Sequence, residues 1–326
     1  MKAPIIVVTD PIHQAGLDAL ERIASVVKLY EFDEDSRFDQ LGKAEAIVMR
    51  GFQATADVMK ACPQLKLITK HGSGVDNIDI PSATALGICV VNTPGGNNAS
   101  AVAEGAVSLM LAVQRRILDI DNWTRNNQFS RRAKEPLHDL WESTLGLVGT
   151  GHIARVVAQI CGKGFRMKIK GFDPYVSAES MEADGIEKVS DLYELMSGVD
   201  IVSIHTPLTS ETKHLIRGEH LSKMKPDAIL VNTSRGSVVD EQALIGALSS
   251  KTIRAAGIDV FEKEPPDPDN PLFSLKNVVG SPHIAGITQN SLKGMALSCA
   301  EVIDQFFSGN KPKTILNGDI WPKRKQ

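Results

Sequence analysis

Arg235, Glu264 and His283 are side chains whose types and placement suit acid–base chemistry on a small anion. Each one follows a short run of small and β-branched residues that is typical of a buried strand. The three runs are residues 228–232, 255–259 and 278–280. Ligands of an open parallel sheet bind outside the carboxyl ends of its strands, so we expect the three side chains to converge on one crevice.

Each of these residues also has a simpler interpretation. A lone arginine usually forms a surface ion pair, a lone glutamate is usually solvated, and a lone histidine is usually structural. The shared placement favours a functional interpretation of Arg235 and His283. Glu264 is harder to select because Glu262 lies two residues away, and only its position in a motif described below favours it.

The segment 145–154, LGLVGTGHIA, has the residues of a phosphate-binding turn between a strand and a helix. Gly149 permits the tight turn, Gly151 lets the backbone approach a pyrophosphate, and the small Ala154 lets the helix pack against the strand. The pyrophosphate would lie at the amino end of the helix, where free N–H groups point at it. An ordinary glycine turn is the alternative, but a strand precedes this turn and a helical run follows it.

Asp173 ends the next expected strand, 22 residues after Gly151. A carboxylate there accepts hydrogen bonds from the ribose hydroxyls and repels a 2′-phosphate, so the sequence favours NAD over NADP. A plain turn residue before Pro174 is the alternative, and it explains less. We therefore predict a dinucleotide site.

Short β-branched runs alternate with helical patterns along nearly the whole chain, which is typical of βαβ units and a parallel sheet. Helices are expected at 14–24 and 55–61, among five strands at 5–9, 26–30, 46–49, 65–69 and 88–92. Six more strands are expected at 144–148, 168–172, 201–205, 228–232, 255–259 and 278–280. The predicted fold is α/β with two doubly wound parallel sheets, the first flavodoxin-like and the second a Rossmann sheet.

Residues 92–98, NTPGGNN, interrupt this alternation with turn-forming residues. Apolar residues then recur at three- and four-residue steps from Val102 to Ile120, so one long amphipathic helix is expected. Two interpretations of that helix stay open: it packs across a subunit interface, or it lines its own domain. A last helix at about 288–307 is expected to return to the first domain.

These breaks predict two domains, one of them discontinuous. Residues 1–98 with 287–326 are expected to form a substrate-binding domain, and the NAD-binding Rossmann domain at 99–286 is expected to be inserted in it.

The composition is that of an ordinary globular protein, with 42% hydrophobic and 23% charged residues and a formal net charge of -3. The chain has no excess of positive charge that would indicate a nucleic-acid or membrane partner. The four cysteines are scattered, which argues against a zinc site or a disulfide scaffold and fits a reducing compartment. The first ten residues are typical of a strand and not of a signal peptide, and no apolar run approaches the ~20 residues of a membrane span. We expect a cytoplasmic protein without a metal.

The sequence resembles the D-isomer-specific 2-hydroxyacid dehydrogenase family, in the branch of phosphoglycerate dehydrogenases and hydroxypyruvate/glyoxylate reductases. Six segments carry the resemblance, in family order: HGSGVDNID (71–79), NTPGGNNASAVAE (92–104), LGLVGTGHIA (145–154), LVNTSRGSVVDEQAL (230–244), AGIDVFEKEP (256–265) and SPHIAG (281–286). The resemblance implies hydride transfer between NAD and a small 2-oxo or 2-hydroxy acid. A homodimer is expected from the family alone.

The resemblance also implies a role for each residue of the trio. Arg235 would bind the substrate carboxylate through its fixed guanidinium donors. His283 would be the acid in reduction and the base in oxidation, since an imidazole ordinarily titrates near ~6.5. Glu264 would accept a hydrogen bond from the imidazole and orient it. The N–H groups of Ser73 and Gly74 would complete the carboxylate clamp.

Further residues would surround the dinucleotide beside Gly149, Gly151 and Asp173. By resemblance they lie at the pyrophosphate, the adenosine half, the nicotinamide half and the carboxamide. They are His152, Ile153, His205, Thr206, Pro207, Thr233, Ser234, Arg235, Asp259, His283, Ala285 and Gly286.

Lys70 and His71 replace the small or apolar pair expected before the Gly-x-Gly turn. With Arg50, they could make the substrate mouth basic and suit a second anionic group, such as a phosphate or a sulfonate. Solvated surface charges are an equal alternative.

Two other functions stay open at this point. An NAD(H)-sensing protein of the corepressor type would keep the cofactor site and regulate through dimer surfaces, but retention of the whole trio favours an enzyme. A formate dehydrogenase shares the fold and replaces the Glu/His pair, which this chain keeps.

Overall fold

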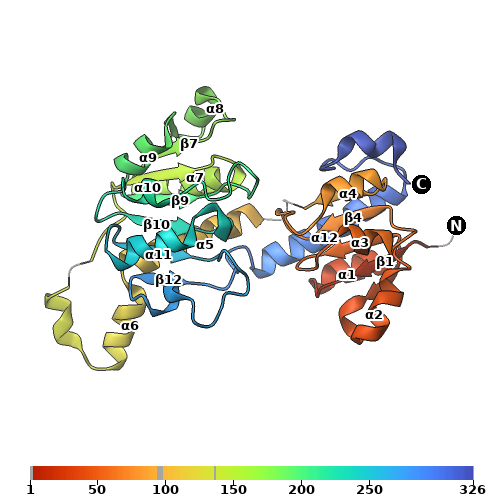
Figure 1. The fold of residues 1–326 in the computed structure, drawn as a ribbon, viewed down its shortest axis with the longest axis horizontal. Coiled ribbons are helices and arrows are strands. Elements are labelled where there is room, and N and C mark those ends of the chain that lie inside the picture. Colours follow the sequence, from red (N-terminus) through yellow and green to blue (C-terminus); the bar gives the residue numbers. More distant parts are fainter. Residues whose placement is uncertain (1–2, 94–97, 136, 326) are drawn as a thin grey trace. The chain divides into compact units, whose positions relative to one another are not determined.

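The computed structural model describes residues 3–93, 98–135 and 137–325 (Figure 1). The chain folds into two compact units, Met1–Asn98 with Ile287–Gln326, and Ala99–Gly286. Each unit is built on one parallel sheet. The turn expected between the two units lies partly outside the described residues, because residues 94–97 are not described.

The discontinuous unit has a five-stranded sheet in the order β2-β1-β3-β4-β5, which is the flavodoxin-like order that we predicted. Its strands are β1 (Ile5–Val8), β2 (Ser25–Lys28), β3 (Ala46–Met49), β4 (Leu67–Lys70) and β5 (Cys89–Asn92). Its helices are α1 (Gln14–Glu21), α2 (Glu34–Leu41), α3 (Ala56–Lys60), α4 (Ile80–Ala85) and α12 (Gln289–Phe307), with 3-10 turns η1 (Leu29–Glu31) and η5 (Gly318–Lys323). The second strand ends two residues earlier than expected because the chain turns into η1.

Helix α12 packs closely against α1 within this unit. A Cβ atom placed on Gly16 would overlap with Cβ of Ala296, so the two helices meet where one of them has no side chain. Cys299 and Ile303 of α12 are buried in the same core as Leu17 of α1. Because of this close packing, α12 belongs to the same unit as the first helix of the chain.

The unit of residues 99–286 has a seven-stranded sheet in the order β12-β11-β10-β9-β6-β7-β8. The strands are β6 (Thr144–Val148), β7 (Lys168–Phe172), β8 (Glu187–Lys188), β9 (Ile201–Ile204), β10 (Ile229–Asn232), β11 (Ala255–Ile258) and β12 (Val278–Gly280). The order reverses between β6 and β9, which is the switch point of a doubly wound sheet. The sequence predicted six strands and missed β8, whose two residues are too few to show a period.

Helices cover both faces of this sheet, as the Rossmann pattern requires. They are α5 (Asn98–Gln114), α6 (Ile117–Arg125), α7 (His152–Phe165), α8 (Ala178–Ala183), α9 (Leu192–Gly198), α10 (Gly218–Leu221) and α11 (Glu241–Ser249), with 3-10 turns η2 (Phe129–Ala133), η3 (Gly236–Val238) and η4 (Pro271–Ser274).

The expectation of one continuous helix from Val102 to Ile120 is wrong. The chain forms α5 and α6, and Arg116 between them takes a left-handed φ of 48°. The Arg116 guanidinium binds Asp119 at 2.7 Å and Glu135 at 2.5 Å, and these ion pairs stabilise the break. Buried α5 residues such as Met110 belong to the core of residues 99–286, so α5 lines its own unit.

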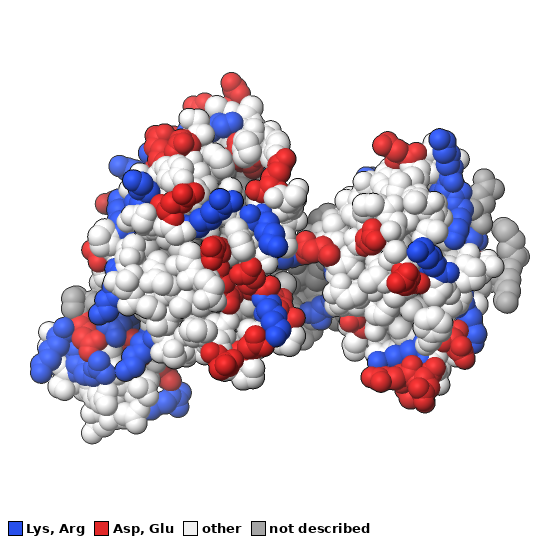
Figure 2. Space-filling model, in the orientation of Figure 1, with Lys and Arg blue, Asp and Glu red and all other residues white. Residues whose placement is uncertain are grey.

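Lys and Arg are interspersed with Asp and Glu over much of the visible face in Figure 2. Among the described residues, no helix combines the length and the apolar character that crossing a bilayer requires.

Candidate active site

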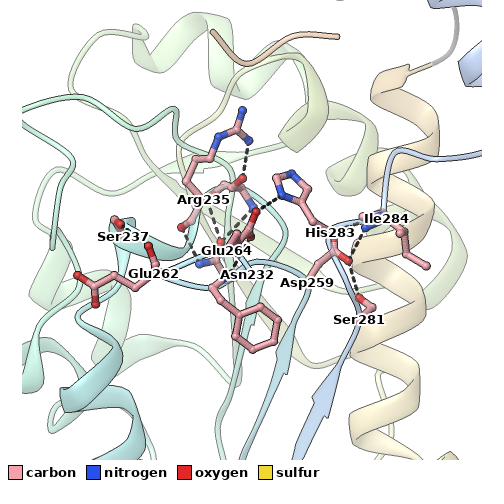
Figure 3. A network of polar contacts seen from close by, with 12 residues as sticks. Asn232, Arg235, Ser237, Asp259, Glu262, Glu264, Ser281, His283 and Ile284 are labelled. Atoms are coloured by element: carbon pink, nitrogen blue, oxygen red, sulfur yellow. Dashed lines mark hydrogen bonds and ion pairs between the residues drawn. The ribbon is translucent and has the colours of Figure 1, made fainter. Parts of the chain in front are cut away.

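Glu264 and His283 form a hydrogen-bonded pair in the unit of residues 99–286. Nδ1 of His283 lies 2.6 Å from Oε2 of Glu264, and the side chains are 46% and 35% exposed, respectively. Figure 3 shows the two side chains facing each other from the segments that follow β12 and β11. A carboxylate at Nδ1 orients the ring and leaves Nε2 to exchange a proton with a ligand.

Two contacts hold the Glu264 carboxylate. Beside the bond to His283, its Oε1 accepts the backbone N–H of Phe261 at 3.0 Å. Burial acts to raise the pKa of Glu264, but these hydrogen bonds and the charges of His283 and Arg235 outweigh it and hold the pKa below its ordinary value. The carboxylate is therefore anionic near neutral pH, as the partner of a proton-transferring imidazole must be.

Asp259 fixes the segment that carries His283. Its buried carboxylate accepts the Ser281 hydroxyl at 2.5 Å and the N–H groups of Ile284 and Ala285 at 3.0 Å. The His283 N–H donates to the Asp259 carbonyl at 2.7 Å. His283 has a left-handed φ of 53°, a conformation that a non-glycine residue keeps only when its surroundings impose it. Asp259 therefore positions the imidazole. Its predicted contact with the carboxamide of the nicotinamide would be a second role.

Arg235 follows β10 on a turn built around Asn232. The Asn232 side chain donates to the Arg235 carbonyl at 2.9 Å and accepts the Ser234 N–H at 3.0 Å. The Arg235 guanidinium donates to the Ser234 carbonyl at 2.7 Å. Figure 3 shows Arg235, Glu264 and His283 within one network of polar contacts. The structure thus brings together all three residues of the predicted trio.

A hollow of about 490 Å³ adjoins Glu264 and His283. Phe261, Pro265 and Leu272 are among its apolar walls. Such walls weaken the hydration of a carboxylate, which is the physical reason that burial acts to raise the pKa of Glu264.

Gly149 and Gly151 shape the turn between β6 and α7. Gly149 has a left-handed φ of 84°, and a Cβ there would lie 2.9 Å from the methyl carbon of Thr206. A Cβ at Gly151 would meet no atom of the described chain within 4 Å, so the turn borders open space. Gly151 is also the N-cap of α7 and has no side-chain cap, which leaves the first N–H groups, those of His152 and Ile153 among them, for a ligand.

Asp173 lies just beyond β7, beside this turn. Its Oδ2 accepts the Thr150 N–H at 2.9 Å, and its Oδ1 accepts the Tyr175 N–H at 2.9 Å. Oδ2 also accepts the Thr150 hydroxyl at 3.3 Å, whereas Oδ1 keeps a further lone pair, so the fixed carboxylate can still accept a ribose hydroxyl.

Thr206 and Thr233 have buried hydroxyl oxygens without a hydrogen-bond partner in the described part of the chain. A buried hydroxyl left unpaired costs about 1–3 kcal/mol, so each of these atoms requires a partner such as a water molecule or a ligand. The two residues follow β9 and β10 at the carboxyl edge of the sheet. Together with the open space at Gly151, these orphaned atoms fit a dinucleotide.

The other predicted cofactor residues lie in loops after the same strands. His205 follows β9, with Nε2 2.8 Å from the Ser203 hydroxyl, and burial lowers its pKa to about 4, so it is neutral. The remainder are Pro207 after β9, Ser234 after β10, and Ala285 and Gly286 after β12.

Ser73 and Gly74 lie in the other unit, in the turn after β4. The carbonyl of Ser73 accepts the Asn92 side chain at 2.9 Å, and its hydroxyl accepts the Asn98 side chain at 3.0 Å. Among the described residues, nothing accepts the N–H groups of Ser73 and Gly74. Their approach to Arg235 stays a prediction.

The interpretation of Lys70 and His71 as solvated surface charges is wrong, because they are only 9% and 3% exposed. The Lys70 ammonium donates to the Arg50 carbonyl and, at 2.8 Å, to Asn77. Burial, followed by the charge of Arg50, lowers the pKa of His71 to about 4, so the imidazole is neutral. Of the three residues proposed for a basic mouth, Arg50 alone is partly exposed.

Sequence reasoning missed the residues that hold the trio in place, Asn232 and Ser281 among them. The order Asn-x-Ser after a strand is a signal for an Asx turn and could have identified Asn232. No comparable signal marks Ser281, whose bond to Asp259 joins residues 22 positions apart.

Comparison with known proteins gives one family. Residues 107–285 match the family model of the D-isomer specific 2-hydroxyacid dehydrogenase, NAD binding domain. The chain is 38% identical to D-3-phosphoglycerate dehydrogenase of Methanocaldococcus jannaschii over 321 residues, which cover 98% of this chain and 60% of that protein. The chain thus spans little more than half of the phosphoglycerate dehydrogenases that it matches.

Other relatives match at full length. Glyoxylate reductase of Thermococcus gammatolerans is 37% identical, with 97% of each chain covered. A crystal structure of an NADPH-dependent glyoxylate/hydroxypyruvate reductase from Sinorhizobium meliloti, in complex with NADP and malonate, superposes with a TM-score of 0.85 at 28% identity, covering 100% of this chain and 99% of that one.

Proposed function

The chain belongs to the D-isomer-specific 2-hydroxyacid dehydrogenases, and from this premise we propose that it interconverts a small 2-oxo acid and its D-2-hydroxy acid with NAD(H). The observation that carries the proposal is the His283–Glu264 pair, which lies beside Arg235. The same unit holds the turn of Gly149 and Gly151 between β6 and α7, called the dinucleotide turn below. Glyoxylate, hydroxypyruvate and phosphohydroxypyruvate are the substrates that the named relatives suggest.

Each residue of the trio has a different role toward the substrate. The Arg235 guanidinium binds the carboxylate, and its planar donors set the orientation of the adjacent carbonyl. Nε2 of His283 donates a proton to the carbonyl oxygen during reduction and removes it during oxidation. Glu264 keeps the ring oriented and offsets the positive charge of the imidazolium. A bound NADH supplies the hydride.

The residues present fit NAD. The α7 N-terminus would hold the pyrophosphate, the Asp173 carboxylate would accept the ribose hydroxyls, and the orphaned hydroxyls of Thr206 and Thr233 would gain partners. The Asp173 charge disfavours a 2′-phosphate, so NAD is preferred over NADP. The Sinorhizobium relative uses NADPH, so the fold alone does not decide this choice.

In the other unit, the N–H groups of Ser73 and Gly74, which the described chain leaves without an acceptor, complete the carboxylate clamp of the proposed site. Arg50 lies near them in the same unit, since Lys70 at the end of β4 donates to its carbonyl. We assign the second anionic group of a phosphorylated or sulfonated substrate to Arg50.

The assembly and location are also proposals. A homodimer is supported by large apolar side chains that the described chain leaves exposed on and near α6, including Leu118 at 61% and Phe129 at 59%. Sedimentation velocity would give the mass directly, and a monomer at micromolar concentration would reject the dimer. The four free, buried cysteines fit a reducing cytoplasm.

The experiment that tests the function is the decay of NADH absorbance with glyoxylate, hydroxypyruvate, phosphohydroxypyruvate and a sulfonated analogue, compared as kcat/KM. Turnover of at least one of them is expected. Tight NADH binding without turnover on any of them would support an NAD(H)-sensing protein on the same fold instead.

A further inference from the structure

A second His–Glu pair lies outside the catalytic trio. Nε2 of His214 is 2.6 Å from Oε1 of Glu262, and the two side chains are about one-third exposed, at 33% and 34%. Figure 3 shows the Glu262 side chain pointing away from His283. Glu262 is therefore no alternative partner of His283, although it lies two residues from Glu264.

His214 is fastened to the segment that follows Arg235. Its N–H donates to the Ser237 carbonyl at 2.8 Å, and two residues later the Ile216 N–H donates to the Val238 carbonyl at 3.1 Å. Glu262 thus binds His214, and His214 is hydrogen-bonded to the segment that follows Arg235.

The same turn touches the Glu262 backbone directly. A Cβ atom on Gly236 would overlap with the carbonyl carbon of Phe261 and with the nitrogen of Glu262. No side chain fits between these two stretches of backbone, so the turn after β10 and the loop after β11 pack against each other at Gly236.

The loop is anchored at a further point by α11. Oε2 of Glu241 accepts the Glu262 N–H at 2.9 Å, and Oε1 accepts the Asn270 side chain at 2.8 Å. One residue before the first of these anchors, the Phe261 N–H donates to the Glu264 carboxylate. The position of the Glu264 carboxylate therefore depends on where the backbone of residues 261–262 is held.

We infer that His214 and Glu262 are positioning residues for the acid–base pair. Their hydrogen bond closes a ring that runs from His214 through the Ser237 turn and the Gly236 contact to Glu262, and the ring fixes the loop that presents Glu264 to His283. This inference rests on the proposed function, because positioning of the imidazole affects turnover only if the imidazole transfers the proton. Displacements of about 0.5 Å in such a group are already costly.

The test compares Glu262→Ala with Glu262→Gln. The amide oxygen of glutamine still accepts the imidazole N–H, so Gln is expected to keep nearly wild-type kcat, whereas Ala is expected to lower kcat about 10-fold and to shift the pH profile of kcat/KM, on the scale of a misplaced catalytic group. The dissociation constant of NADH should change less than about twofold in both, since the dinucleotide turn is untouched. The matched control is Asp267→Ala, which removes an exposed ion pair with Lys263 in the same loop and should leave kcat unchanged.

Equal activities of Glu262→Ala and wild type would overturn the inference, and so would a Gln variant as impaired as the Ala variant. Hydrogen exchange of the 259–264 amides needs no turnover and gives a second readout. The Phe261 amide should lose protection in Glu262→Ala and keep it in Glu262→Gln, and unchanged protection in both contradicts the ring. Wild-type inactivity on every 2-oxo acid would reject the proposed function, and hydrogen exchange would still decide on the ring.

Discussion

The Asp259 carboxylate accepts three hydrogen bonds from the segment that bears His283. The backbone carbonyl of Asp259 accepts the backbone N–H of His283 at 2.7 Å. One buried acid thus fixes the backbone of His283, while Glu264 fixes its ring. The imidazole is held from two directions before any ligand arrives, which is the preorganisation that proton transfer requires.

Replacing His283 by alanine is expected to lower kcat by about 10²-fold or more, the usual scale of general acid–base catalysis. The dinucleotide turn lies on β6 and α7, so NADH binding should stay nearly intact. Steady-state kinetics and fluorescence titration with NADH measure the two effects separately. Near-wild-type turnover would remove His283 from the proposed role.

Arg235→Lys should weaken the substrate clamp and not the cofactor site. An ammonium replaces the planar fork by a point charge, and the loss of one charged hydrogen bond of about 1.5–3 kcal/mol corresponds to about 10- to 150-fold in kcat/KM. The loss should appear mainly in KM for the 2-oxo acid. A variant with unchanged KM would show that the carboxylate binds elsewhere.

Asp173→Asn tests the choice of dinucleotide. The amide removes the negative charge that opposes a 2′-phosphate, so the ratio of kcat/KM for NADH to that for NADPH should fall. The substitution also alters the bond to the Tyr175 N–H or the Thr150 N–H, so thermal unfolding is measured alongside. An unchanged ratio in a folded variant would place the ribose contact at another residue.

His71→Leu should change how stability depends on pH. Burial lowers the pKa of His71 to about 4 in the folded chain, against about 6.5 when unfolded, so the native state resists protonation. That stability is present above pH 6.5 and is lost as the pH falls toward 4. At pH 5, His71 alone lowers the free energy of unfolding by about 2 kcal/mol relative to neutral pH. A leucine at this position removes that loss.

The unfolding free energy of His71→Leu should therefore fall less than that of the wild type between pH 7.5 and pH 5, as measured by urea denaturation. His205, whose pKa burial also lowers to about 4, remains in both proteins and serves as an internal reference. Parallel pH profiles of the two proteins would contradict the buried, neutral state of His71.

The sequence predicted both sheets and the convergence of the trio because those features depend on local patterns. Apolar strands, glycine turns and polar residues at strand ends are visible within windows of about ten residues. The strands from Thr144, Lys168 and Val278 begin and end where the pattern predicts.

Features set by tertiary contacts were not predicted. At the break, the Arg116 guanidinium pairs with Glu135, which lies 19 residues further along the chain. The burial of Lys70 depends on the Arg50 carbonyl, which lies on a neighbouring strand end. Neither acceptor can be inferred from the residues next to the cation, so a basic residue alone gave no indication of its surroundings.

The proposed function requires that the hydride pass directly from C4 of the nicotinamide to C2 of the substrate, and isotopic labelling follows that transfer. The protein is supplied with NADH that carries two deuterium atoms at C4 of the nicotinamide and with glyoxylate or hydroxypyruvate, and the product is analysed by NMR and chiral chromatography. We expect deuterium at C2 and, for hydroxypyruvate, the D-hydroxy acid, and we expect His283→Ala to form this labelled product at least about 10²-fold more slowly. Product without deuterium at C2, the L-hydroxy acid, or an undiminished rate of labelled product in His283→Ala would contradict the proposed mechanism.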